Sequence, residues 1–175
     1  MSKIKRLAII PARCGSKRIP NKNIRKFCGR PIIHYVLDTI NESKLFDTVH
    51  VSTDCEQIRK NVTDFGCPPD FGRPTEIADD QTPLIPVLKY VCENYLKQGK
   101  DFDQVWLLMP TSPFLEVKDL VKAIKCVFLK NYKGIINIGQ KRKSDFENYK
   151  RFKPDIKPCK RKDITIFGND YPTPD

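Results

Sequence analysis

The 175-residue chain lacks any long hydrophobic run. No apolar stretch approaches the roughly 20 residues that a membrane-spanning helix requires. The N-terminus, MSKIKRLAII, also lacks the apolar length and the small-residue cleavage site of a signal peptide. The length and the balance of 39% hydrophobic to 30% charged residues fit one globular domain. We therefore expect no membrane partner and a cytoplasmic location.

Closely spaced cysteine pairs are also missing. There is no CxxC pair and no histidine at zinc-binding spacing, and the seven cysteines are spread singly, at positions 14, 28, 55, 67, 92, 126 and 159. Such scattering indicates reduced thiols rather than a zinc site. Most of them fall in or beside apolar segments, where a thiol packs as a small hydrophobic group. Cys14 is the exception, because it lies inside a basic loop.

The opening segment has no acidic residue before Asp38. Its ten lysines and arginines give it a charge of +10, whereas residues 38–120 carry eight basic and fifteen acidic residues, and residues 121–175 carry fourteen and six. Basic ends of this kind, with residues 141–162, would suit a nucleic-acid-binding module. The basic stretch lacks the regularly interleaved aromatic residues of a stacking platform, so nucleic acid is the least favoured partner.

Short apolar runs alternate with amphipathic segments along the chain. Strands are predicted at 6–10, 48–52, 104–109 and 134–138, and helices at 31–43, 54–66, 83–97 and 116–130, with an irregular excursion at 67–82. This alternation predicts an α/β layered fold with a mainly parallel sheet. Residues 1–140 form the expected core, and residues 141–175 form a basic C-terminal segment without clear periodicity. The loops after Ile10, Ser52 and Met109 should share one rim of the sheet, where ligands of such folds bind.

Residues 11–23, PARCGSKRIPNKN, join a strand end to glycine, serine, two lysines and two arginines. Glycine lets backbone N–H groups approach phosphate oxygens, and the cationic side chains neutralise a polyphosphate. The loop does not follow the G-x4-G-K-[ST] pattern. On composition alone, a solvated basic loop is as good an interpretation as a phosphate-binding one.

Four ordered segments carry a family resemblance. IIPARCGSKRIPNKNIRKFCGRPII, VSTDCEQI, GRPTEIADDQTP and LLMPTSPF resemble segments of the CMP-sialic acid synthetases, the acylneuraminate cytidylyltransferases. The resemblance covers about residues 4–114. It implies a nucleotide-diphospho-sugar-transferase-like sandwich. In that family, the anomeric hydroxyl of a sialic-acid-like 2-keto sugar acid attacks the α-phosphorus of CTP and releases pyrophosphate.

The resemblance also assigns site residues and partners. It implies catalytic roles for Arg13, Lys17 and Lys22, because phosphoryl transfer depends on positioning and charge neutralisation. It implies a homodimer and a magnesium cofactor. The implied nucleotide-binding residues are Pro11, Ala12, Arg13, Ser16, Lys17, Asn23, Arg73 and Thr111, and the implied substrate-binding residues are Met109, Pro110 and Ser112.

The chain departs from the family pattern at several positions. Cys14 replaces the first of two paired glycines, Met109 stands where the family usually has glutamine, and Leu115 stands where it often has arginine. The chain stops at GNDYPTPD, before the late acidic element that the resemblance would expect to hold magnesium, so no metal ligand is assigned. These departures leave a second hypothesis open, a nucleotide-binding relative without catalysis.

Other polar residues have two interpretations. Asp54 could cap the following helix or contact a ligand or metal, and Asp79 and Asp80 could form a hydrophilic turn or do the same. His34 and His50 are more simply explained as packing residues than as catalysts, because they lie in an apolar helix and a strand.

Overall fold

The computed structural model describes residues 3–16, 19–79, 81–129, 134–138 and 164–166, with side chains through residue 125. Its main sheet has the strand order β4-β1-β5-β6-β7. The strands, in that order, are Thr48–Ser52, Arg6–Pro11, Gln104–Leu108, Gly134–Ile138 and Ile164–Ile166. The first four run parallel, and β7 pairs antiparallel with β6. The predicted α/β layered architecture is confirmed.

Strand β1 lies between β4 and β5 and is buried on both faces. Leu7 and Ile9 point into one core, against α3 (Leu84–Lys97). Ala8 and Ile10 alternate with them and point into the opposite core. A strand covered on both faces needs an unbroken apolar run, because successive side chains face opposite ways. The sequence LAII supplies that run.

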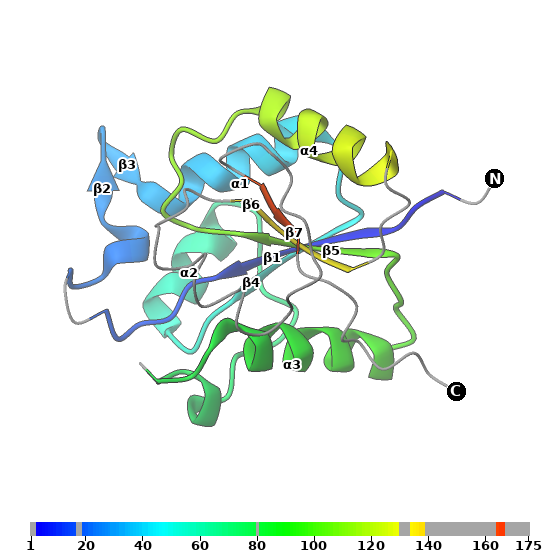
Figure 1. Ribbon diagram of the computed structural model, residues 1–175. Helices are drawn as coiled ribbons and strands as arrows, with labels where there is room; N and C mark the ends of the chain where they lie inside the picture. Colours follow the sequence, from blue (N-terminus) through cyan, green and yellow to red (C-terminus); the bar gives the residue numbers. More distant parts are fainter. Residues whose placement is uncertain (1–2, 17–18, 80, 130–133, 139–163, 167–175) are drawn as a thin grey trace.

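Three helices cover the face of the sheet opposite α3. They are α1 (Ile32–Ser43), α2 (Glu56–Asp64) and α4 (Val117–Leu129). Figure 1 shows α1 and α4 on one side of the sheet and α3 on the other. None of the helices in the described part of the chain is long and apolar enough to cross a bilayer.

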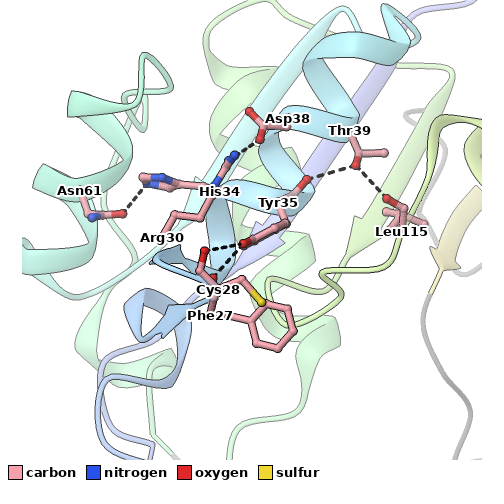
Figure 2. Close-up of polar contacts among 9 residues, drawn as sticks. All are labelled: Phe27, Cys28, Arg30, His34, Tyr35, Asp38, Thr39, Asn61 and Leu115. Atoms are coloured by element: carbon pink, nitrogen blue, oxygen red, sulfur yellow. Dashed lines mark hydrogen bonds and ion pairs between the residues drawn. The ribbon is translucent and has the colours of Figure 1, made fainter.

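Polar side chains of α1 fasten neighbouring segments to this helix (Figure 2). Tyr35 donates its hydroxyl hydrogen to the Phe27 carbonyl at 2.8 Å, and Phe27 belongs to a small hairpin of β2 (Lys26–Phe27) and β3 (Arg30–Pro31). Thr39 donates to the Leu115 carbonyl at 2.8 Å. Helix α1 therefore anchors both the hairpin and the segment that leads into α4.

The predicted elements match the observed ones to within two residues at each end. Helix α2 shows the largest shift, because it begins at Glu56 and ends at Asp64, before a left-handed glycine, Gly66, with φ +92°. The hairpin and β7 were not predicted. Most of the predicted C-terminal segment lies outside the described residues, although β7 comes from it and extends the sheet.

Candidate functional site

The carboxyl ends of β4, β1 and β5 meet at one edge of the sheet. Strands β1 and β4 are in register through Pro11 and Ser52 at their ends, and the ladder continues one bond further, from the Ala12 N–H to the Ser52 carbonyl at 2.9 Å. Open parallel sheets bind ligands beyond these ends. The predicted convergence of loops at this rim is confirmed for the loops after β1 and β4.

A depression of about 590 Å³ opens at this edge. It lies between the loop after β1, the turn after β4 and the segment that follows the short 3-10 helix η2 (Thr75–Ile77). The lining residues are Arg13, Gly15, Ser16, Asp54, Ala78, Asp79 and Gln81. One guanidinium and two carboxylates therefore face the same space, which is large enough for a small polar ligand.

Hydrogen bonds fix the start of the loop after β1. The Cys14 N–H donates to Asp54 Oδ1 at 3.0 Å, and the Ser16 N–H donates to the Cys14 carbonyl at 2.8 Å. From further along the chain, Asn23 Nδ2 donates to the Arg13 carbonyl at 3.1 Å. The loop is thus held by β4's turn on one side and by η1 (Lys22–Ile24) on the other. These hydrogen bonds fix the backbone that carries Arg13 and Ser16.

Asn23 is 4% exposed, and its Oδ1 has no hydrogen-bond partner among the described residues. Its amide is therefore committed to holding the loop through Nδ2. Asn21, two residues earlier, has φ 51°, a left-handed conformation that asparagine tolerates better than most residues. Asn23 acts here as a positioning residue beneath the loop, and its predicted nucleotide contact stays a prediction.

Arg73 lies behind the turn after β4 and is 7% exposed. Its Nε donates to Ser52 Oγ at 3.1 Å, and its Nη2 donates to the Ser52 carbonyl at 2.7 Å. Burial lowers the pKa of Arg73 to about 10, with Asp54 opposing the shift, so the guanidinium remains charged at neutral pH. Arg73 does not line the depression. It holds the strand end that carries Asp54, and its predicted direct contact with nucleotide stays a prediction.

The loop after β5 lies on the other side of β1 from the depression. Pro110 is buried, Met109, Thr111 and Ser112 are half-buried, and none of the four lines the depression. The Ser112 carbonyl accepts the Leu115 N–H at 3.2 Å. The structure therefore places these residues on the same rim as the basic loop but does not bring them into the same hollow.

A cysteine of the basic loop contacts a cysteine at the N-terminal end of α2. Cys14 Sγ and Cys55 Sγ are 2.7 Å apart, and both are reduced. Cys14 is exposed, whereas Cys55 is 6% exposed and occupies the N-cap position of α2. The hydrogen bond with Cys55, together with burial, raises the pKa of Cys14 to about 11.

The structure corrects one of the roles predicted for the acidic residues, the helix cap at Asp54. Asp54 does not cap α2, because Cys55 is the N-cap and the Asp54 carboxylate accepts the Cys14 N–H instead. Asp79 Oδ1 accepts the N–H groups of Gln81 and Thr82, so it does form a turn, and it lines the depression as well. Asp80 lies outside the described residues.

The described residues place two carboxylates, Asp54 and Asp79, at the depression. They contain no group of three histidine, cysteine, aspartate or glutamate residues that could hold a metal ion. The Asp54 and Asp79 oxygens named above already accept backbone N–H groups. Magnesium therefore stays an expectation from the resemblance, and no chemical step is assigned to it.

Of the three residues predicted to be catalytic, Arg13 lines the depression, Lys22 lies half-buried in η1, and Lys17 falls outside the described residues. Both histidines are packing residues, as predicted. His34 Nε2 is 2.8 Å from Asn61 Oδ1, on the side of α1 that faces α2 (Figure 2), and His50 is 1% exposed.

Ala78 and Gln81 line the depression but were not among the predicted site residues. Asp54 lines it as well, although ligand contact was only one of the two roles predicted for it. The signal for Asp54 was its place two residues after a strand end, on the same rim as the basic loop. The proximity of Cys14 to Cys55 had no signal, because 41 residues separate them.

Comparisons with known proteins agree with this architecture. Residues 7–162 match the family described as "Cytidylyltransferase". The pseudaminic acid cytidylyltransferase of Campylobacter jejuni, serotype O:2, is 38% identical over 128 residues, which are 73% of this chain and 55% of that protein. An N-acylneuraminate cytidylyltransferase of Escherichia coli is 32% identical over 78% of this chain and 32% of its own length. The chain thus spans about half, or less, of the length of these relatives.

A solved structure shares the fold. It is described as a CMP:2-keto-3-deoxy-manno-octonic acid synthetase complexed with CTP, and it aligns with a TM-score of 0.60 at 21% identity, over 77% of this chain and 51% of that one. The match supports the nucleotide-sugar-transferase fold predicted from sequence. With the family match over most of its length, the chain belongs to the cytidylyltransferase family.

Proposed function

We propose that the depression binds the triphosphate of CTP and that the chain transfers CMP from CTP to a sialic-acid-like 2-keto sugar acid. The observation that carries the proposal is the convergence of Arg13, Gly15 and Ser16 on one hollow at the carboxyl edge of the sheet. A guanidinium beside a glycine-containing backbone turn suits an anionic phosphate chain. The Asp54 and Asp79 carboxylates, which line the same hollow, accept backbone N–H groups. The relatives' names supply the substrate class.

In this reaction the anomeric oxygen bonds to the α-phosphorus, the bond between that phosphorus and the oxygen that bridges it to the β-phosphorus breaks, and pyrophosphate leaves. The hydroxyl proton passes to solvent. Residues of this chain neutralise the charge of the phosphates and hold them in position. Arg13 neutralises negative charge on the phosphates, and Lys22 extends the cationic surface along the same loop. Lys17 is proposed for the same task from its place in the sequence. Cationic groups that are already fixed stabilise the developing charge without reorganising.

The test is incubation of the chain with CTP, magnesium and a panel of sugar acids that includes pseudaminic, N-acetylneuraminic and N,N'-diacetyllegionaminic acids. Pyrophosphate release is measured for each. We expect release that depends on the presence of one of these sugars. The absence of release with every sugar would contradict the proposed transfer.

A second candidate is CTP binding without turnover. One observation favours it: the apolar side chain of Met109 stands on the expected sugar side of the rim. Calorimetry separates the candidates, because binding without pyrophosphate release supports the second and absence of binding rejects both.

We also propose a homodimer, which light scattering coupled to size-exclusion chromatography would detect.

Substitution of Arg13 tests where the nucleotide binds. Arg13→Ala removes a charged hydrogen-bond donor, which typically contributes about 1.5–3 kcal/mol. We expect CTP affinity to fall about 10- to 100-fold by calorimetry. Arg25→Ala is the matched control, because Arg25 is exposed in the same basic segment but does not line the depression. Equal effects of the two substitutions would indicate nonspecific attraction to the basic segment.

A further inference from the structure

Cys14 and Cys55 bring two separate segments of the site together. Cys14 belongs to the loop after β1, between Arg13 and Gly15, both of which line the depression. Cys55 follows Asp54, another lining residue, and is the N-cap residue of α2. The two sulphur atoms are 2.7 Å apart. A bond between them would therefore join the two walls of the depression directly.

Hydrogen bonds hold the backbone at both cysteines. The Cys14 N–H is held by Asp54 Oδ1 at 3.0 Å, and the Cys55 N–H is held by Thr53 Oγ1 at 3.1 Å. A disulfide has a sulphur–sulphur length of about 2.0 Å, so closure requires a movement of less than about 1 Å. Cys14 is exposed, which gives a dissolved oxidant access to one sulphur of the pair.

We propose that Cys14 and Cys55 are a modification site, at which a reversible disulfide fastens the loop after β1 to the start of α2. The oxidant class is a low-molecular-weight disulfide such as glutathione disulfide. The loop conformation that lines the depression is then covalently retained. This is the conformation in which the sulphur atoms are already in contact.

The exchange balances in two steps. The Cys14 thiolate attacks one sulphur of glutathione disulfide, which forms a mixed disulfide and releases one glutathione thiolate. The Cys55 thiolate then attacks Cys14 Sγ and displaces the second glutathione thiolate. The two protons of the cysteines pass to the two glutathione thiolates through solvent. The protein pair is oxidised by two electrons, and glutathione disulfide is reduced to two molecules of glutathione.

The high pKa of Cys14, about 11, makes its thiolate scarce at neutral pH. The first step is therefore slow at pH 7 and faster as pH rises. Once the mixed disulfide has formed, the second step is intramolecular, and the resolving sulphur is already adjacent. The mixed disulfide on Cys14 should thus be short-lived compared with one on an isolated cysteine.

The consequence for nucleotide binding rests on the proposed function. Arg13, Gly15 and Ser16 line the depression in the same conformation that brings the sulphur atoms together. A disulfide therefore removes alternative loop conformations without dismantling the site, which is the effect of pre-organisation. We expect the oxidised form to bind CTP at least as tightly as the reduced form.

The first experiment detects the disulfide without reference to nucleotide. The chain is incubated with glutathione disulfide at pH 8.5, blocked with an alkylating reagent, digested with trypsin without reduction and analysed by mass spectrometry. We expect a cross-linked pair of the peptides 14–17 and 45–59. The midpoint of unfolding should rise by about 5–10 °C, because the bond closes a long loop.

Cys28→Ser is the matched control, because Cys28 is exposed but has no part in the pair. We expect this variant to form the same cross-link. Cys14→Ser and Cys14→Gly should lose the cross-link and the thermal shift, and Cys14 is exposed enough for both variants to fold. A persistent glutathione adduct on wild-type Cys14, or separate alkylation of Cys14 and Cys55 after oxidation, would overturn the proposal.

The second experiment compares CTP binding by oxidised and reduced wild-type chain in calorimetry. Equal or tighter binding by the oxidised form is the expected result, and a loss of tenfold or more would overturn the claim that the loop is retained in its binding conformation. If neither form binds CTP, the proposed function fails. The cross-link itself is decided by mass spectrometry and is not affected by that failure.

Discussion

His50 occupies a nearly sealed position in β4. It is 1% exposed, its ring stacks on Phe71 with centroids 4.3 Å apart, and its Nδ1 is 3.3 Å from the Tyr95 hydroxyl oxygen. Its Nε2 has no hydrogen-bond partner among the described residues. Burial lowers the pKa of His50 to about 4, even though Asp70 opposes the shift. The neutral imidazole is therefore part of the folded structure.

This shift predicts a loss of stability on mild acidification. Between pH 6.5 and 4 the unfolded chain binds a proton at His50 that the folded chain does not, so stability falls as pH falls through this window. The contribution is fully present above pH 6.5. At pH 5 the loss should be about 2 kcal/mol. Urea unfolding at pH 7.5 and pH 5 measures it.

His50→Phe provides the control for this prediction, with His50→Gln as a second variant in case the larger ring cannot be packed. Both remove the titrating group while leaving the surface carboxylates and His34 unchanged. The difference in unfolding free energy between pH 7.5 and pH 5 should be about 2 kcal/mol smaller in the variants than in the wild type. An unchanged difference would show that His50 is not the group responsible.

At the level of elements, the turn from β4 into α2 depends on Arg73. Its guanidinium bonds to both the hydroxyl and the carbonyl of Ser52, and its backbone N–H donates to the Thr53 carbonyl at 2.9 Å. The segment that leads to η2 is thereby tied to the end of a central strand. The turn presents Asp54 to the depression, so a change in the conformation of the turn affects the site as well as the fold.

Arg73→Met should therefore destabilise the chain. The substitution keeps most of the apolar stem but removes charged donors from a buried carbonyl, at a cost of about 2 kcal/mol in unfolding free energy. Arg59→Met is the control on the neighbouring helix, because its ion pair with the exposed Glu56 is 3.4 Å long and contributes less than about 0.5 kcal/mol. Equal losses by chemical denaturation would contradict the assigned role of Arg73.

The elements that could be predicted from sequence are those with strong periodicity. Strand β1 is a continuous apolar run, and α1 carries an apolar stripe, so both follow from local pattern. The β2–β3 hairpin has only two residues in each strand and turns through Cys28 and Gly29 at positive φ, which leaves no periodic signal. Strand β7 is three residues long and depends on pairing with β6.

The site was predictable only in part, for a related reason. The basic loop could be recognised from its own residues, because glycine and cationic side chains lie next to one another in sequence. The contact of Cys14 with Asp54 spans 40 residues and follows from the register of β1 with β4. Register depends on tertiary packing, so local sequence patterns do not reveal such partners.

For the whole molecule, nucleotide binding should stabilise the fold. A ligand at 100 times its dissociation constant adds about 2.7 kcal/mol to the unfolding free energy, which raises the melting temperature by about 5–10 °C in a chain of this size. We expect CTP to produce this shift and ATP and UTP to produce smaller ones at equal concentration. The same shift with all three nucleotides would argue against recognition of the cytosine base.

The most direct test is a crystal structure of the chain grown with CTP. We expect the triphosphate to occupy the depression between the loop after β1 and the turn after β4, with the Arg13 guanidinium and the backbone near Gly15 and Ser16 in contact with phosphate oxygens. A nucleotide bound elsewhere, with Arg13 turned away from it, would contradict the proposed triphosphate site.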